Sequence, residues 1–287
     1  MMLDRRRMLA GSAVLATAFA TGPLAAMGGN AGNRIGLQLY TLRELFAPDP
    51  MGTLEQVAAI GYREVEYGGG GYEAMDHAAL RKTMDRLGLT APSIHVGYDA
   101  LAGKFDATVA MARTLGADTV VVPWMAEEYR EPAAWRAAVA DFNRLAERLK
   151  KADLGFAYHN HDFEFTVKDG DRSLFDVLVA ERDPALVEIE LDLFWAVKAG
   201  EDPGALIRRL PGQIYAYHVK DMTADGAMTS VGKGTIDFAD IFTLNELAGV
   251  RHLYVENDQS PAPYLPDITT SFATLDRLGA RTDNQGT

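Results

Sequence analysis

The sequence contains no cysteine. Disulfide bonds and thiolate metal sites are therefore excluded, so any metal ion must be held by histidine, aspartate, glutamate or water. Basic residues are also few compared with acidic ones: 28 lysines and arginines stand against 40 aspartates and glutamates, and the net charge is −12. Because such a chain repels phosphate backbones and anionic lipid surfaces, nucleic acids and membranes are not expected partners.

Long apolar runs are missing as well. The run from Leu9 to Ala20 is shorter than the ~20 residues of a membrane-spanning helix, and it directly follows Asp4-Arg5-Arg6-Arg7-Met8. This pattern resembles a twin-arginine export signal. We therefore predict that residues 1–27 are a signal peptide, cleaved near Ala20 or Ala26, and that the mature protein is periplasmic without a membrane anchor. Removing these residues, which hold one aspartate and three arginines, leaves a charge of −14.

From Asn33 onward, β-type and α-type stretches alternate. The predicted strands are 35–40, 62–67, 91–96, 119–122, 156–159, 187–192, 214–219 and 253–256. The predicted helices are 53–60, 76–87, 105–115, 133–151, one from 173, one from 203, 238–247 and 267–278. Glycines at helix ends, as in Leu87-Gly88 and Leu115-Gly116, are typical of C-caps followed by short loops.

Eight strand–helix units in roughly 250 residues are typical of a (β/α)₈ TIM barrel. We predict one α/β domain over residues 33–281, followed by a tail at 282–287. A doubly wound open sheet is the competing architecture. However, the first strand is not followed by a glycine-rich nucleotide-binding turn, and Gly68-Gly69-Gly70-Gly71 is interpreted as a flexible loop.

Polar side chains gather where the predicted strands end, which in a barrel is the catalytic face. Four of the six histidines (His95, His159, His161 and His218) fall at such ends, together with Asp192 and Glu256. Imidazoles and carboxylates are the ligands that divalent metal ions prefer when thiolates are missing. His77 and His252 lie elsewhere, and we interpret both as structural.

The motifs around these ends resemble the xylose-isomerase-like TIM barrels, a sugar isomerase/epimerase superfamily that also includes inosose dehydratases and endonuclease IV. The resemblance covers about Arg34 to Gly279. It is carried by Tyr158-His159-Asn160-His161-Asp162-Phe163-Glu164-Phe165, Leu191-Asp192-Leu193-Phe194-Trp195, His218-Val219-Lys220-Asp221-Met222, Val231-Gly232-Lys233-Gly234-Thr235-Ile236-Asp237-Phe238 and Val255-Glu256-Asn257-Asp258.

The resemblance implies one divalent metal ion. Epimerases of this superfamily hold it, often as manganese, with Glu, Asp, His and Glu from strands five to eight. Asp192, His218 and Glu256 match the last three positions, but His159 stands at the first, with Glu164 close behind. The expected metal set is therefore His159, Asp192, His218 and Glu256, with Glu164 as the alternative first ligand. Manganese is expected, with cobalt, zinc or magnesium as alternatives.

The resemblance further implies a sugar isomerase or epimerase that works through a metal-stabilised enediolate. Glu256, His159 or His161 would be the base, and Lys220 would neutralise the developing oxyanion. The residues expected to bind the substrate are Gln38, Glu66, His95, Trp124, Glu164 and Trp195. No arginine-rich or glycine-rich phosphate cradle is evident, so we expect a non-phosphorylated sugar or keto-sugar.

Other functions fit the same residues. Because His159 replaces a glutamate, the enediolate could instead expel a group, which would make the protein a 3-keto-glycoside lyase or hydratase. A non-catalytic sugar-binding barrel is a further alternative, but binding alone does not require Asp192, His218 and Glu256 together. A nuclease like endonuclease IV would need several zinc ions and a basic groove, which the acidic charge disfavours. A homo-oligomer is compatible with the sequence.

Overall fold

The computed structural model describes residues 35–280. The predicted signal peptide at 1–27 and tail at 282–287 lie outside the described residues, so both remain predictions. Within residues 35–280, no helix is both long and apolar enough to cross a membrane.

Eight parallel strands form one sheet in the order β2-β1-β12-β9-β8-β5-β4-β3. Their bounds are β1 Ile35–Gln38, β2 Glu64–Glu66, β3 Ser93–His95, β4 Thr119–Val122, β5 Gly155–His159, β8 Val187–Asp192, β9 Ile214–Val219 and β12 His252–Val255. The edges β2 and β3 meet through isolated bridges, and the His95 amide donates to the Tyr67 carbonyl at 2.8 Å. The sheet therefore curves into the predicted barrel.

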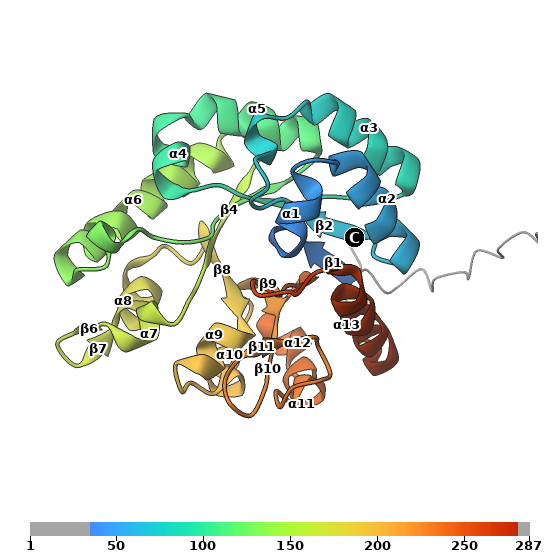
Figure 1. The fold of residues 1–287 in the computed structure, drawn as a ribbon. Helices are drawn as coiled ribbons and strands as arrows, with labels where there is room; N and C mark the ends of the chain where they lie inside the picture. The colour runs from blue at the N-terminus through green and yellow to red at the C-terminus, as the bar shows by residue number, and fades with distance from the viewer. Residues whose placement is uncertain (1–34, 281–287) are drawn as a thin grey trace, which may run out of the picture.

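Helices surround the strands (Figure 1). They are α2 Pro50–Ile60, α3 His77–Leu87, α5 Phe105–Leu115, α6 Pro132–Lys150, α8 Leu174–Glu181, α10 Pro203–Arg209, α11 Phe238–Phe242, α12 Asn245–Ala248 and α13 Leu265–Leu278. The alternation confirms the predicted (β/α)₈ architecture. One helix differs from the prediction: 238–247 is divided into α11 and α12, with Thr243 and Leu244 between them.

Short elements that the sequence analysis did not predict follow the strand ends. They are the 3₁₀ helices η1 Leu39–Leu42, η2 Tyr72–Ala74 and η3 Glu127–Tyr129, the helices α1 Arg43–Phe46, α4 Tyr98–Gly103, α7 Phe163–Thr166 and α9 Leu193–Lys198, and the hairpins β6 Lys168–Asp169 with β7 Arg172–Ser173 and β10 Asp221–Met222 with β11 Met228–Thr229. Elements this short have little periodicity that a sequence pattern can reveal, yet they position several side chains of the site.

Local sequence explains where the outer helices begin and end. The Asp76 carboxylate accepts from the Ala79 amide at the start of α3, and Ser173 and Asp176 form a capping box at the start of α8. Gly88 and Gly116 end α3 and α5 in the left-handed region, with φ of 68° and 84°. The predicted glycine C-caps are confirmed at both positions.

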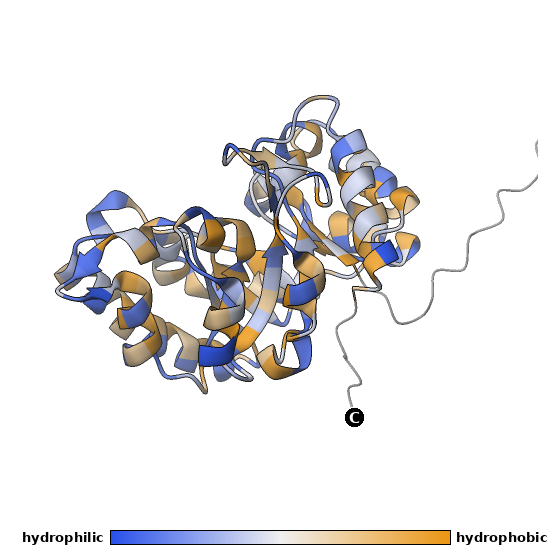
Figure 2. Ribbon diagram, turned by 90° about the horizontal axis from the view of Figure 1, so that it is seen from below, coloured by the Kyte–Doolittle hydropathy of each residue, from blue (hydrophilic) through white to orange (hydrophobic). Residues whose placement is uncertain are grey.

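The main core lies between the strands and the helices. Trp135 of α6 is fully buried, and its indole nitrogen donates to the Leu174 carbonyl at 2.8 Å. Its ring packs edge-on against Phe142 and Tyr158. Apolar and polar residues alternate along the outer helices (Figure 2), as expected for helices with one face against a sheet.

Candidate active site

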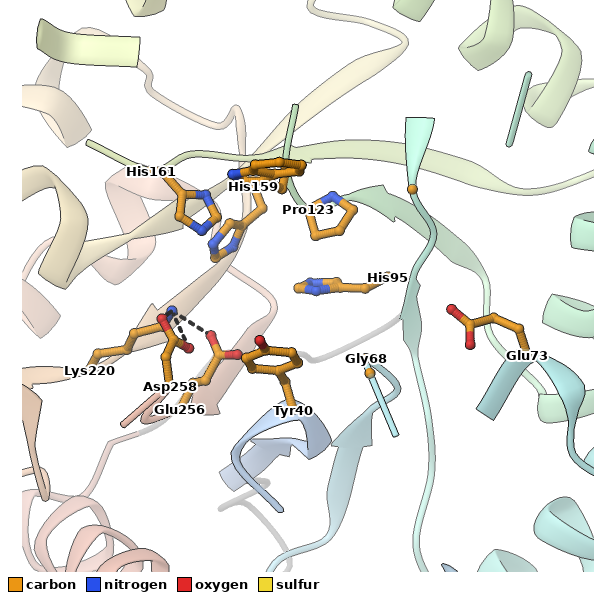
Figure 3. A pocket seen from close by; sticks show the side chains of 13 residues that line it. Tyr40, Gly68, Glu73, His95, Pro123, His159, His161, Lys220, Glu256 and Asp258 are labelled. Atoms are coloured by element: carbon orange, nitrogen blue, oxygen red, sulfur yellow. Dashed lines mark hydrogen bonds and ion pairs between the residues drawn. The ribbon is translucent and has the colours of Figure 1, made fainter. Parts of the chain in front are cut away.

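The carboxyl ends of the strands surround a cavity of about 430 Å³ (Figure 3). Its lining consists of Tyr40, Gly68, Gly69, Glu73, His95, Gly97, Pro123, Trp124, His159, His161, Lys220, Glu256 and Asp258. Of the residues predicted from the sequence, the lining includes His95, Trp124, His159, His161, Lys220 and Glu256. This is the end of the barrel where catalytic residues are expected.

Asp192, His218 and Glu256 converge beside this cavity, and Glu256 also lines it. They come from the ends of the adjacent strands β8, β9 and β12, and all three are buried. Each offers one ligand atom, and these atoms lie within 4.8 Å of one another. His218 Nδ1 lies 2.7 Å from Glu256 Oε2, while Asp192 Oδ1 accepts from the Trp195 amide at 2.8 Å and so begins α9. The barrel thus gathers three predicted metal ligands.

Glu190 is a buried site residue that the sequence analysis missed. Its Oε2 lies 2.8 Å from His95 Nε2 and 3.1 Å from His218 Nε2. Its Oε1 is buried without a hydrogen-bond partner among the described residues. A signal was available: Glu190 and Asp192 are two positions apart on one strand, so they point to the same side of the sheet.

The described residues contain a second possible metal set: His95, His159, Glu190 and His218. It shares His218 with the first. Both sets offer only nitrogen and carboxylate oxygen, which suits manganese, cobalt or zinc. Within residues 35–280, Glu190 Oε1 is a buried acceptor without a hydrogen-bond donor, and a nearby cation would compensate for the missing donor. The donor set therefore fits the divalent ion that the sequence predicts.

Glu66 and Gln38 lie behind the cavity wall. Glu66 Oε2 lies 2.8 Å from His218 Nε2 and accepts from Gln38 Nε2 at 2.8 Å, while Gln38 Oε1 accepts from the Tyr40 amide. Both side chains are fully buried and neither lines the cavity. Their predicted contacts with substrate hydroxyls therefore do not follow from their positions, because their polar atoms already bind the protein.

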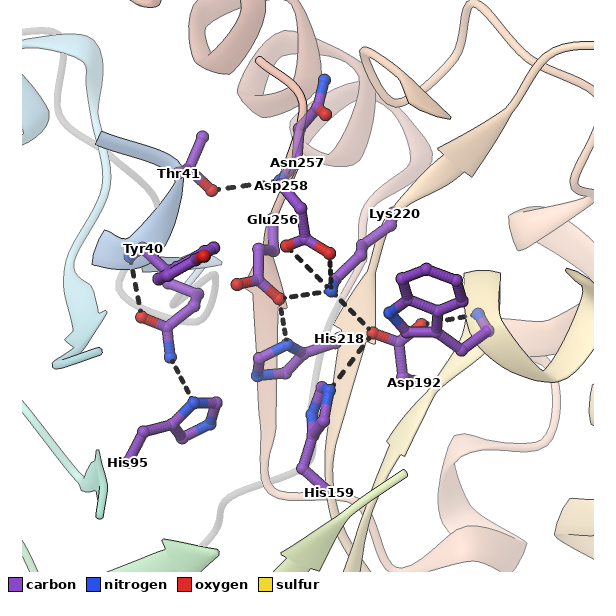
Figure 4. A network of polar contacts seen from close by, with 12 residues as sticks. Tyr40, Thr41, His95, His159, Asp192, His218, Lys220, Glu256, Asn257 and Asp258 are labelled. Atoms are coloured by element: carbon purple, nitrogen blue, oxygen red, sulfur yellow. Dashed lines mark hydrogen bonds and ion pairs between the residues drawn. The ribbon is translucent and has the colours of Figure 1, made fainter. Parts of the chain in front are cut away.

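Lys220 is a buried cation among three carboxylates (Figure 4). Its Nζ lies 2.7 Å from Glu256 Oε2, 3.0 Å from Asp192 Oδ2 and 3.1 Å from Asp258 Oδ2. Burial alone would lower the pKa of Lys220, but the three carboxylates outweigh it and raise that pKa well above its usual value. Lys220 is therefore protonated at neutral pH.

Burial opposes the ionisation of Glu256, but Lys220 and His218 hold the pKa of its carboxyl well below the usual value. Glu256 is therefore ionised at neutral pH, and its Oε2 already contacts Lys220 and His218. The pKa of His161 is lowered to about 3, first by burial and then by Lys220. His161 is consequently neutral at pH 7, and its Nδ1 is buried with no hydrogen-bond partner among the described residues.

The structure distinguishes the two candidates for the fifth-strand ligand. His159 Nε2 lies 3.5 Å from Asp192 Oδ2, and His159 belongs to the second metal set. Glu164 in α7 faces elsewhere: it accepts from the Tyr158 hydroxyl at 2.5 Å and from the His161 amide at 2.8 Å. Glu164 is fully buried and does not line the cavity, so its position supports neither metal ligation nor the predicted substrate contact.

The two predicted tryptophans differ in their placement. Trp124 is 47% exposed and lines the cavity. Trp195 does not line it, but its ring lies 5.3 Å from the His161 ring and 5.9 Å from Lys220 Nζ. Trp195 therefore packs against His161 and Lys220 outside the cavity lining.

The remaining two histidines lie outside the cavity lining. His77 Nε2 is 3.0 Å from the Tyr72 carbonyl, and His252 Nδ1 is 2.8 Å from Glu64 Oε2.

Asp221, directly after Lys220, accepts from the Gly232 and Gly234 amides at 2.8 and 2.9 Å. A Cβ at Gly234 would lie 2.2 Å from Asp221 Oδ1, which explains the Lys-Asp and Gly-Lys-Gly motifs as one anchored turn.

Comparison with known proteins agrees with this architecture. The family model of the xylose isomerase-like TIM barrel matches residues 54–256. An inosose dehydratase from Clostridium tetani is 29% identical over 149 residues, which are 45% of this chain and 48% of that relative. The match therefore spans about half the length of this relative.

Solved structures resemble the chain over most of its length. A sugar phosphate isomerase/epimerase from Parabacteroides distasonis superimposes with a TM-score of 0.73 at 25% identity, covering 88% of this chain and 96% of that one. An L-ribulose 3-epimerase has a TM-score of 0.67 at 19% identity, with 85% and 94% covered. At that identity the second likeness concerns the fold alone.

Proposed function

The chain belongs to the xylose isomerase-like TIM barrel family, and on that basis we propose that it is a divalent-metal-dependent isomerase or epimerase of a non-phosphorylated sugar. The observation that carries the proposal is the meeting of Asp192, His218 and Glu256 beside His161, whose Nδ1 has no hydrogen-bond partner among the described residues. Metal ligands next to a neutral base are the combination needed to remove a proton from a carbon beside a carbonyl.

The metal-holding residues divide into ligands and supports. Asp192, His218 and Glu256 would hold the ion through oxygen and His218 Nδ1, with His159 beside them. When bound, the ion supplies Lewis-acid polarisation of a substrate carbonyl. Glu190 lies 3.1 Å from His218 Nε2, on the side of the ring opposite the proposed metal. A carboxylate in that position fixes the orientation of the imidazole and increases its basicity.

His161 is the base that the geometry favours. It lines the cavity, it is neutral, and its buried Nδ1 has no competing partner among the described residues. Its backbone is held by the hydrogen bond from its amide to Glu164. The ammonium of Lys220, which also lines the cavity, would stabilise the negative charge that develops on the substrate oxygen when the proton leaves.

The charge of the lining favours a sugar without phosphate. Glu73, Glu256 and Asp258 contribute carboxylates, whereas Lys220 is the one lysine or arginine among the described residues of the lining. Lys220 is itself bound by three carboxylates. A phosphate group would therefore meet net negative charge instead of the arginines or helix N-termini that usually bind it.

Elimination by a 3-keto-glycoside lyase or hydratase is the second candidate. The position where epimerases carry the first glutamate holds His159, so the pair of glutamates that would exchange protons on both faces of a carbon is incomplete. The relatives named inosose dehydratase point in the same direction. In this version His161 still removes the proton, and the enediolate expels a group from the next carbon.

The test combines metal content with proton exchange. Wild-type protein loaded with manganese should contain about one ion, and Asp192→Ala and Glu256→Ala should lose it. Solvent deuterium should enter a panel of ketoses and 3-keto glycosides, and the products should separate isomerisation from elimination. No retained ion after loading with manganese, cobalt or zinc would refute the metal-dependent mechanism. An ion without proton exchange would leave a sugar-binding barrel.

A further inference from the structure

Two exposed aromatic rings lie in the active-site cavity. Among the described residues, four large hydrophobic side chains are exposed: Tyr40 at 39%, Trp124 at 47%, Leu247 at 42% and Leu278 at 41%. The two aromatic members of this set, Tyr40 and Trp124, both line the cavity. Aromatic rings usually bury a large area, so two exposed rings in one concave site indicate a surface that a ligand covers.

An arginine supports each ring. The Arg43 guanidinium carbon lies 4.2 Å from the centre of the Tyr40 ring, and that of Arg130 lies 4.9 Å from Trp124. Arg43 also donates to the Tyr40 and Asp258 carbonyls, at 2.8 and 3.1 Å, and Arg130 donates to the Met125 carbonyl at 3.0 Å. The stacked guanidinium holds one face of each ring, so the rings are pre-organised platforms rather than mobile side chains.

Glycines form part of the wall between the two platforms, together with Glu73 and His95. Tyr40 follows β1 and Trp124 follows β4. The strands between them in the barrel are β2, which is followed by Gly68 and Gly69, and β3, which is followed by Gly97. Gly69 has φ of +66°, and a Cβ there would lie 2.6 Å from the Tyr40 ring. The tetraglycine segment, predicted as a flexible loop, therefore packs against Tyr40.

Gly97 shows that this wall is open. It has an ordinary φ of −56°, and a Cβ there would meet no atom within 4 Å. Neither backbone strain nor crowding explains the glycine, so the missing side chain leaves free space beside the cavity. The opposite half of the lining is different in character, because His159, His161, Lys220, Glu256 and Asp258 are all polar.

We propose that Tyr40, Trp124 and Gly97 form a subsite for a second ring, so that the substrate is a glycoside rather than a free monosaccharide. The reacting sugar lies at the polar half, and the ring joined to it, a second sugar or an aromatic group, stacks on the platforms. The identity of the reacting sugar rests on the proposed function, whereas the subsite is tested by binding alone.

The experiment measures equilibrium binding by calorimetry on the manganese-loaded protein. Methyl β-D-glucoside and methyl β-D-galactoside are the one-ring probes. Cellobiose and lactose add a sugar ring, and the corresponding phenyl glycosides add an aromatic ring, so the arms distinguish the two sources of the second ring. Wild type should bind at least one two-ring class about five- to tenfold more tightly than the matched methyl glycoside, the range expected from ring stacking.

Variants assign the preference to the subsite. Trp124→Ala and Gly97→Val should abolish the preference for two-ring over one-ring probes, and Trp124→Phe should retain part of it. Leu247→Ala removes a similarly exposed hydrophobic side chain away from the cavity and should change nothing. Equal binding of one-ring and two-ring probes, a preference that survives in Trp124→Ala, or no binding of any probe would overturn the subsite. Ring preference without proton exchange would retain it and reject only the proposed reaction.

Discussion

Lys220 Nζ lies 2.7 Å from Glu256 Oε2, the same oxygen that lies 2.7 Å from His218 Nδ1. The lysine also lies 3.0 Å from Asp192 Oδ2. An ammonium group thus contacts two of the three side chains expected to hold the metal ion. A divalent ion held by this set would compete with Lys220 for both carboxylates, and Lys220 would keep its contact with Asp258, which lies 3.1 Å away.

Replacing Lys220 with methionine should therefore increase affinity for manganese while it lowers turnover. In the metal-free variant, Asp192 and Glu256 lose their buried counter-charge, and breaking such a pair costs about 3–5 kcal/mol of unfolding free energy. Manganese should restore more stability to the variant than it adds to wild type. Calorimetric titration and thermal unfolding with and without manganese measure both effects.

The matched control for that substitution is Lys198→Met. Lys198 donates to the Gly226 carbonyl on the exposed surface, so its loss should leave affinity and stability nearly unchanged. Weaker manganese binding in Lys220→Met would show that the lysine supports the ion instead of competing with it.

His161→Gln should lower kcat by about 10²- to 10⁴-fold, the usual contribution of a general base. Metal content and thermal stability should remain close to wild type, because His161 belongs to neither metal set. Deuterium incorporation into substrate is the direct measurement. His77→Gln, at a histidine outside the cavity lining, is the control. Undiminished exchange in His161→Gln would move the base to His159 or Glu256.

Glu190→Gln should weaken metal binding about 10- to 100-fold, as expected when the carboxylate behind a ligating histidine is removed. Glu188, two residues earlier on β8, pairs with Arg251 instead and is partly exposed. Glu188→Gln should therefore bind the ion normally. Complete loss in Glu190→Gln, with the ion retained in Glu256→Gln, would place the ion in the second metal set, with His95 and His159.

Glu164 predicts a specific pH dependence of stability. Burial raises the pKa of its carboxyl to about 8, although Tyr158 and the His161 amide donate hydrogen bonds to it. Between its unfolded value, about 4.3, and pH 8, the folded chain holds a proton that the unfolded chain has released. The free energy of unfolding should therefore fall as pH rises through this window.

Glu164→Gln should remove this fall in the free energy of unfolding with rising pH. The variant and wild type should differ least near pH 4.5, and the variant should gain relative stability as the pH approaches 8. Urea unfolding at several pH values measures the difference. A constant difference across the range would show that Glu164 is ionised in the folded protein.

Much of the fold and part of the site followed from local sequence. Stretches rich in apolar residues located the eight strands, because parallel strands covered on both faces are mostly apolar, even where glutamates interrupt them, as in β2 and β8. Helix ends were equally local, since glycine is favoured wherever a helix ends in a left-handed residue, as it does at Gly88. The same logic placed His159, His161, Lys220 and Glu256 at the cavity, because residues directly after barrel strands share one face.

Only the tertiary structure decided which of these groups touch. Glu190 lies in the middle of a strand, and its contact with His95 depends on barrel closure, which brings residues 95 positions apart to 2.8 Å. The sequence predicted His159 as the fifth-strand ligand with Glu164 as the alternative, and the structure shows that α7 turns Glu164 toward Tyr158. The stacking of Arg43 and Arg130 on the two exposed rings likewise arises from loop geometry. Local patterns specify which side a residue faces, whereas distances between side chains are set by packing across the whole barrel.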